Sequence, residues 1–179
     1  MALPPGTYKL GPENGTLAVR TGRTGAAAKA GHNLLLHVTS WQATLAVANE
    51  VATSTVELTA DSGSLRVIDG TGGVQALGDD DKAEIQKTID DDVLKREPVT
   101  FRSTSVADTD GGLRVEGALT LRGTTAPIAF DLALADGHVK GGATVTQTAW
   151  KIKPYSALFG ALKVADEVEV ELDAILPPA

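Results

Sequence analysis

The stretch that decides the fold is GGLRVEGALTLRGTTAPIAFDLAL, which runs from Gly111 to Leu134. Its apolar residues stand at every second position, and most positions between them hold Thr, Arg, Glu or Asp. Because successive side chains of a strand point to opposite faces, this alternation is typical of strands with one dry and one wet side. The same parity recurs in Val168–Leu172. Several one-sided strands in series can hide their dry faces by closing into a barrel or by stacking as a sandwich.

Further strands are predicted on both sides of this stretch, wherever short alternating runs are bounded by Gly, Asn, Asp or Ser. The full set of expected strands is 6–10, 15–21, 32–39, 41–48, 53–60, 64–68, 99–107, 112–122, 127–135, 138–148 and 166–176. A cluster of glycines at 69–73 is expected to end the first group of strands. The segment KPYSALFGAL (153–162) lacks alternation and is expected to be a loop or a single helical turn.

One helix is predicted, over roughly residues 80–95. Ile85, Ile89 and Val93 lie four apart, acidic residues crowd the first turn, and Pro98 stops the element. We expect the apolar stripe of this helix to seal one end of the barrel.

Composition fits a single domain over residues 1–179. The net charge of −7 argues against binding to nucleic acid or to an anionic membrane surface. The sequence has no cysteine, which excludes disulfides and thiolate metal sites. We expect no stable membrane insertion, since no apolar run reaches eighteen residues, and the N-terminal residues do not resemble a signal peptide. A cytoplasmic location is therefore expected.

Two motifs give the chain a resemblance to a known family. VTFRSTSV (99–106) and GALTLRGTTAPI (117–128), with Gly6-Thr7-Tyr8 near the start, resemble the YceI-like family of lipocalin-like proteins. This resemblance implies an all-β fold, a lipocalin-like eight-stranded antiparallel β-barrel with one short α-helix. It also implies a homodimer whose barrels hold a polyisoprenoid or another isoprenoid-tailed lipid.

The dry faces predict what would surround such a ligand. With only three Phe, two Trp and two Tyr in the chain, shorter aliphatic side chains are expected to leave a tunnel along the barrel axis. By parity, the expected lining is Leu34, Leu36, Val38, Val56, Leu58, Phe101, Val115, Leu119, Leu121, Phe130 and Leu132. The alternative is that the same residues form a filled core. Trp150, Tyr155, Phe159 and Leu162 either cap the tunnel or pack as an ordinary loop.

A basic rim is a further hypothesis. Arg20, Arg23 and Lys29 occur close together without an acidic residue between them, as do Lys151 and Lys153. A solvated face is the simpler interpretation. The alternative is that these cations meet a phosphate or carboxylate head group while the tail occupies the tunnel.

No catalytic or metal-binding constellation is recognisable in the sequence. There is no activated nucleophile motif, and His32 and His37, five residues apart on one strand, point to opposite faces and cannot share a metal ion. We therefore expect a binding protein without a cofactor, with His32 buried and hydrogen-bonded. Two alternatives remain: an enzyme that uses the barrel as a dry chamber, with His32 or Gln147 inside, and a filled barrel that acts as an interaction scaffold.

Overall fold

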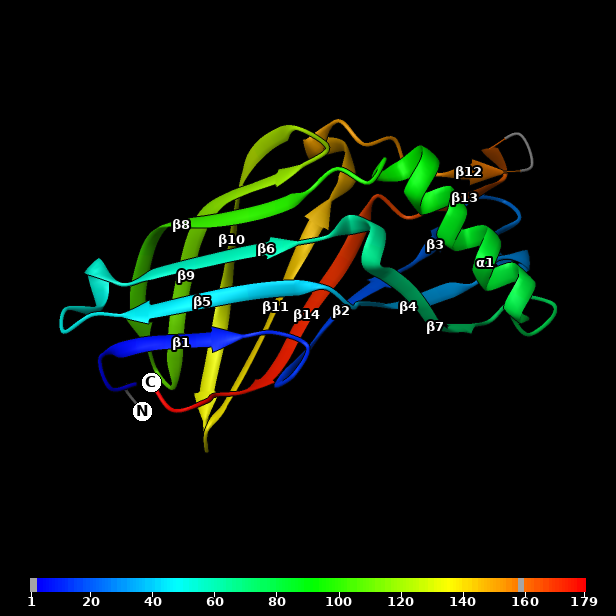
Figure 1. Cartoon of the computed structure of the whole chain (residues 1–179). Helices are drawn as coiled ribbons and strands as arrows, with labels where there is room; N and C mark the ends of the chain where they lie inside the picture. Colours follow the sequence, from blue (N-terminus) through cyan, green and yellow to red (C-terminus); the bar gives the residue numbers. More distant parts are fainter. Residues whose placement is uncertain (1–2, 158–159) are drawn as a thin grey trace.

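The computed structural model describes residues 3–157 and 160–179, and its main feature is one large antiparallel sheet curled strongly into a half-barrel (Figure 1). Its 11 strands are hydrogen-bonded in the order β1-β5-β6-β8-β9-β10-β11-β14-β2-β4-β7. Their bounds are β1 Gly6–Leu10, β2 Gly15–Thr21, β4 Asn33–Val38, β5 Trp41–Val47, β6 Thr55–Ala60, β7 Leu65–Thr71, β8 Val99–Thr109, β9 Gly112–Leu121, β10 Thr124–Ala135, β11 His138–Thr146 and β14 Glu167–Ile175.

The structure confirms the all-β class and the short helix, but the expected count of eight strands is not confirmed. Three breaks in the chain raise the count, at residues 11–14 between β1 and β2, 39–40 between β4 and β5, and 61–64 between β6 and β7. At each break the chain bends and then pairs again with the same neighbouring segment, as β5 and β4 do with β6 and β7. The bends allow long strands to follow the curl.

Tight turns fix the register of the central hairpins. Arg122-Gly123 joins β9 to β10 and Asp136-Gly137 joins β10 to β11, and all four residues have positive φ. Two-residue loops with both φ values positive are the turns whose twist matches antiparallel strands. The strand expected at 127–135 was placed too late, since β10 already begins at Thr124, and Pro127 lies inside the strand opposite Ala118.

The helix starts near the expected residue but changes character halfway. α1 spans Asp79–Thr88, and Asp81 Oδ2 accepts the backbone N–H of Gly78 at 2.9 Å. The next turn, Ile89–Val93, is a π-helix. Lys95 and Arg96, which follow it, have left-handed backbone conformations with positive φ. Ile85, Ile89 and Val93 all face the inside of the curled sheet, where they border its cavity. In Figure 1 the helix lies across one end of the sheet.

A second, smaller sheet corrects the expectation of a loop or single helical turn at 153–162. Its order is β12 (Ser156–Ala157), β13 (Leu162–Val164) and β3 (Arg23–Thr24). Two-residue strands carry no detectable alternation, so the segment at 153–162 gave no strand signal. Four 3₁₀ turns complete the described chain: η1 Ala28–Ala30, η2 Val51–Thr53, η3 Ser62–Ser64 and η5 Gln147–Trp150. Of the helices in the described ranges, none is long and apolar enough to cross a membrane.

Candidate ligand-binding cavity

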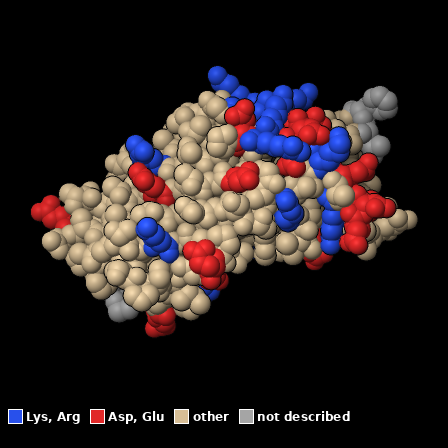
Figure 2. Space-filling model, in the orientation of Figure 1, with Lys and Arg blue, Asp and Glu red and all other residues tan. Residues whose placement is uncertain are grey.

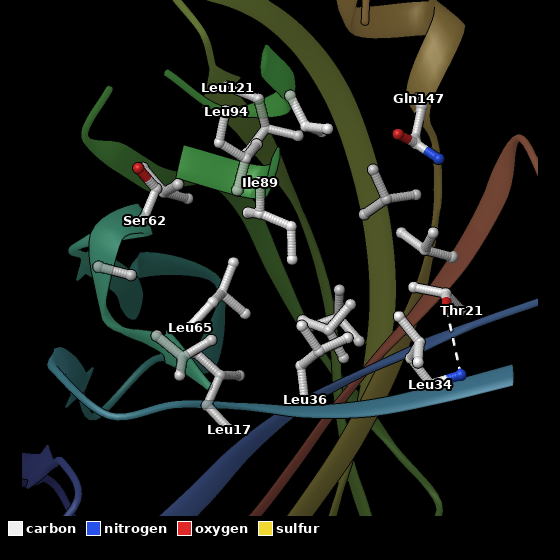
Figure 3. Close-up of a pocket in the computed structure, with 18 of the residues that line it drawn as sticks. Leu17, Thr21, Leu34, Leu36, Ser62, Leu65, Ile89, Leu94, Leu121 and Gln147 are labelled. Carbon is white, nitrogen blue, oxygen red and sulfur yellow. Dashed lines mark hydrogen bonds between the residues drawn. The ribbon is translucent and has the colours of Figure 1, made fainter. Parts of the chain in front are cut away.

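A cavity of about 920 Å³ lies between the concave face of the large sheet and the helix. Every strand of that sheet contributes at least one residue to its wall, from Leu10 on β1 to Leu172 on β14. The wall is predominantly aliphatic, and Figure 3 shows Leu17, Leu36 and Leu65 gathered at one end of it. Volumes of 300–1,000 Å³ are typical of sites that enclose one small molecule, so this cavity is large enough for a ligand.

The alternation of apolar and polar residues in the sequence predicted most of this wall. Of the residues predicted to line a tunnel, all except Val115 border the cavity. Phe101 is 6% exposed, and its ring centroid lies 5.3 Å from that of Phe130 in a tilted arrangement. Whether these residues bind a ligand stays a prediction.

Val115 belongs to the packed core instead. It is 0% exposed and packs in the main core cluster with Val106 and Leu113. Parity places Val115 on the correct face but says nothing about position along the strand. Leu119 and Leu121, further along β9, border the open space inside the half-barrel.

Of the four residues predicted to cap the tunnel, one packs in the core and one borders the cavity. Trp150 is 3% exposed, does not border the cavity, and donates its indole N–H to the carbonyl oxygen of Leu119 at 2.7 Å. It therefore packs η5 against the sheet. Tyr155 borders the cavity and is 47% exposed, as expected of a residue at an opening. Leu162, on β13, does not border the cavity, and Phe159 lies outside the described residues.

The five cations of the proposed basic rim do not border the cavity. Arg20 pairs with Glu171 across β2 and β14, with 3.1 Å between Nε and Oε1. The guanidinium of Arg23 donates to the backbone carbonyls of Gly31 and Thr71. Lys29, Lys151 and Lys153 are exposed.

Two polar residues considered as inward candidates do reach the cavity. His32 donates from Nε2 to the carbonyl oxygen of Gln75 at 2.6 Å, so the expected hydrogen bond is present, but the residue is half-buried and the expectation of full burial was wrong. Gln147 is 8% exposed and donates from Nε2 to the carbonyl oxygen of Ala165 at 3.1 Å.

Sequence reasoning missed part of the wall. Residues 74–77, in the loop before the helix, border the cavity, and so do Ser62 and Thr21. A loop has no periodicity that would reveal its inward side. The glycines at 70–73 were the available signal: a Cβ on Gly73 would lie only 2.4 Å from His32 Nε2, so a side chain there would require the His32 ring to shift.

The charged residues on the wall are mostly acidic and come mainly from the helical segment. They are Asp61, Asp81, Glu84, Lys87, Asp91 and Asp92. Lys87 Nζ donates to Asp91 Oδ2 at 3.0 Å, and this hydrogen bond, with the charge of Lys87, lowers the pKa of Asp91. Figure 2 shows that charged side chains crowd the end of the molecule with the helix, whereas the face over β1, β5 and β6 carries few. Among the described residues, no cluster of three or more His, Asp or Glu side chains is placed to hold a metal ion.

An antiparallel sheet curled around an apolar cavity defines a lipocalin-like binding fold. The chain belongs to the YceI-like family, because the model of the YceI-like domain matches residues 8–176. The recognition from sequence motifs is therefore confirmed.

Solved structures show the same fold at low sequence identity. BcnA of Burkholderia cenocepacia is 15% identical, with a TM-score of 0.63, over 92% of this chain and 96% of BcnA. The YceI protein of Campylobacter jejuni is 11% identical, with a TM-score of 0.54, over 80% of this chain and 85% of that protein. A mutant of that protein with a monobromobimane guest is 10% identical, with a TM-score of 0.56 over the same shares. No curated protein matches the chain.

Proposed function

We propose that this protein binds one long apolar ligand, a polyisoprenoid or an isoprenoid-tailed lipid, inside the cavity and does not alter it chemically. The observation that carries the proposal is the aliphatic wall of the 920 Å³ cavity, to which every strand of the large sheet contributes. Removing apolar surface from water stabilises a complex by about 0.8 kcal/mol per CH₂, so one five-carbon unit adds about 3 to 4 kcal/mol before ordering costs.

The size of the cavity supports an occupant. In an empty cavity the aliphatic wall atoms lack dispersion partners, which lowers the stability of the protein. Water is a poor alternative because each buried molecule needs several polar partners, and most of this wall has none to give. A hydrophobic ligand removes both penalties.

We also infer that the sheet works as a closed barrel of eight bent strands. β1 continues into β2, β4 into β5, and β6 into β7, and counting each such pair as one strand gives eight. Pairing of β14 with β2 and of β5 with β1 supports closure, because β1 and β2 follow each other in the chain. The family resemblance further implies a homodimer, which light scattering tests directly.

The test begins with lipid extracted from protein purified out of its native host and identified by mass spectrometry. Isoprenoid alcohols of increasing length are then offered to delipidated protein. We expect a bound lipid that is recovered chemically unchanged. The affinity of the delipidated protein for the alcohols should rise with each added five-carbon unit until the cavity is full. A chemically modified lipid would identify an enzyme instead. Failure to retain lipid of any length would favour a scaffold and refute the proposal.

A further inference from the structure

One wall of the cavity carries a hydrogen-bond acceptor that the fold does not use. Gln147 stands at the start of η5, borders the cavity and is 8% exposed. Its Nε2 donates to the carbonyl oxygen of Ala165 at 3.1 Å. Because a carbonyl oxygen can only accept, this bond fixes which way the amide is turned. The Oε1 atom is left facing the interior, as Figure 3 shows.

Within the described part of the chain, no group donates to this oxygen. Gln147 Oε1 is not one of the fully buried atoms without a partner, so it is accessible from the cavity that Gln147 borders and is free to accept a hydrogen bond. A donor on the ligand would satisfy Gln147 Oε1.

Further polar groups border the same cavity. Thr21 Oγ1 accepts the backbone N–H of Leu34 at 3.2 Å, which leaves its own hydrogen available. Thr21 lies on the same side as Gln147 in Figure 3, and the backbone connects them: Ala165 accepts from Gln147 and donates to the carbonyl of Gly22 at 3.0 Å. Ser62, on the opposite side, is 3% exposed, and its Oγ has no partner among the described residues. Leu17, Leu36 and Leu65 form an apolar part of the wall in Figure 3.

The charges on the wall disfavour an anionic ligand. Lys87 is the one cation among the described wall residues, its side chain is 79% exposed, and it is already paired with Asp91. Five carboxylate side chains border the same cavity, from Asp61, Asp81, Glu84, Asp91 and Asp92. An anion there would meet like charge, which raises the free energy of the complex.

We propose that Gln147 is a head-group anchor, selecting ligands that end in a neutral hydroxyl over ligands that end in an ether or an anion. The hydroxyl donates to Gln147 Oε1, and the tail runs toward Leu17 and Leu36. This inference rests on the proposed function, since it assigns the head of the ligand whose tail fills the cavity. Gln147 acts on specificity, whereas the apolar wall supplies affinity.

The experiment compares three probes with one isoprenoid tail: the alcohol, its methyl ether, and the corresponding carboxylate. The ether keeps the oxygen and loses only the donor. For the unaltered protein we expect the alcohol to bind roughly tenfold more tightly than the ether, the scale of one hydrogen bond, and the carboxylate to bind most weakly. Equal binding of alcohol and ether, or preference for the carboxylate, would overturn the anchor. Failure to bind all three would instead count against the proposed function.

A variant series then assigns the effect to this residue. Gln147→Met keeps a long flexible side chain without the acceptor, and we expect it to lose the preference for the alcohol while binding the ether as before. Gln42→Met, the same change on the exposed side of β5, is the matched control and should keep the preference. Circular dichroism verifies that both variants fold. If Gln147→Met does not fold, the comparison of the three probes on the unaltered protein still decides the proposal.

Discussion

Replacing Phe130 with alanine separates a cavity wall from a packed core. Phe130 borders the cavity and faces Phe101, 5.3 Å away between ring centroids. In a filled core, Phe→Ala costs about 3 to 5 kcal/mol. Atoms beside an empty space lack part of their dispersion partners, so less is lost here, and we expect a cost of about 2 kcal/mol, which includes the loss of the aromatic pair.

The same substitution should change which ligand fits. It widens the cavity, so the variant accommodates a longer or bulkier tail, and each added five-carbon unit contributes up to about 3 to 4 kcal/mol before ordering costs. The assay offers a mixture of isoprenoid alcohols of different length and identifies the bound species by mass spectrometry. Urea unfolding of ligand-free protein measures the stability.

Val115→Ala is the matched control, because Val115 is fully buried and does not border the cavity. We expect it to lower stability without altering the preferred length. Two results would refute the reasoning: an unchanged length preference for Phe130→Ala, or a loss of stability as large as in a filled core.

Two further experiments test the orientation of the strands and the role of the cations. Leu119→Asp should destabilise the protein severely, because a carboxylate on the inner face cannot be solvated. Thr120→Asp on the outer face should be tolerated. Thermal unfolding compares the two variants, and equal tolerance would show that the faces are misassigned. Replacing Arg20, Arg23 and Lys29 together with Gln tests the basic rim. Because none of them borders the cavity and both arginines have partners in the protein, we expect the relative affinity for a pyrophosphate and an alcohol on the same tail to stay unchanged, and a selective loss of pyrophosphate binding would support the rim.

Alternation predicted the large sheet because a half-exposed strand must repeat every two residues. The expected strands correspond to the eleven of the sheet, with boundaries shifted by a few residues, most at β10 and β7. The short strands β3, β12 and β13 were beyond reach, since two or three residues contain no period. The change from α-helix to π-helix after Thr88 was also hidden, because apolar residues four apart place nearly the same stripe inward in both.

The sequence predicted which face of each strand points inward, but not which positions along the strand border the cavity. Val115 and Leu119 share one face of β9, yet only Leu119 borders the cavity, because core side chains surround Val115 on all sides. Which strand segments converge is set by the curl of the whole sheet, and no local pattern contains it. The loop at 74–77 was missed for the same reason.

The scarcity of aromatic residues connects the composition to the cavity. Aromatic side chains make up 4% of the chain, and Phe101, Phe130 and Tyr155 are the only ones among the described wall residues. The remaining wall is mainly Leu, Val, Ile and Ala, whose short side chains stop before the axis of so wide a sheet. A filled scaffold would need larger residues at these positions, since cores reach the density of organic crystals. The sequence therefore leaves an apolar inner surface that side chains alone do not fill, and this is the physical reason to favour the proposed carrier over a scaffold.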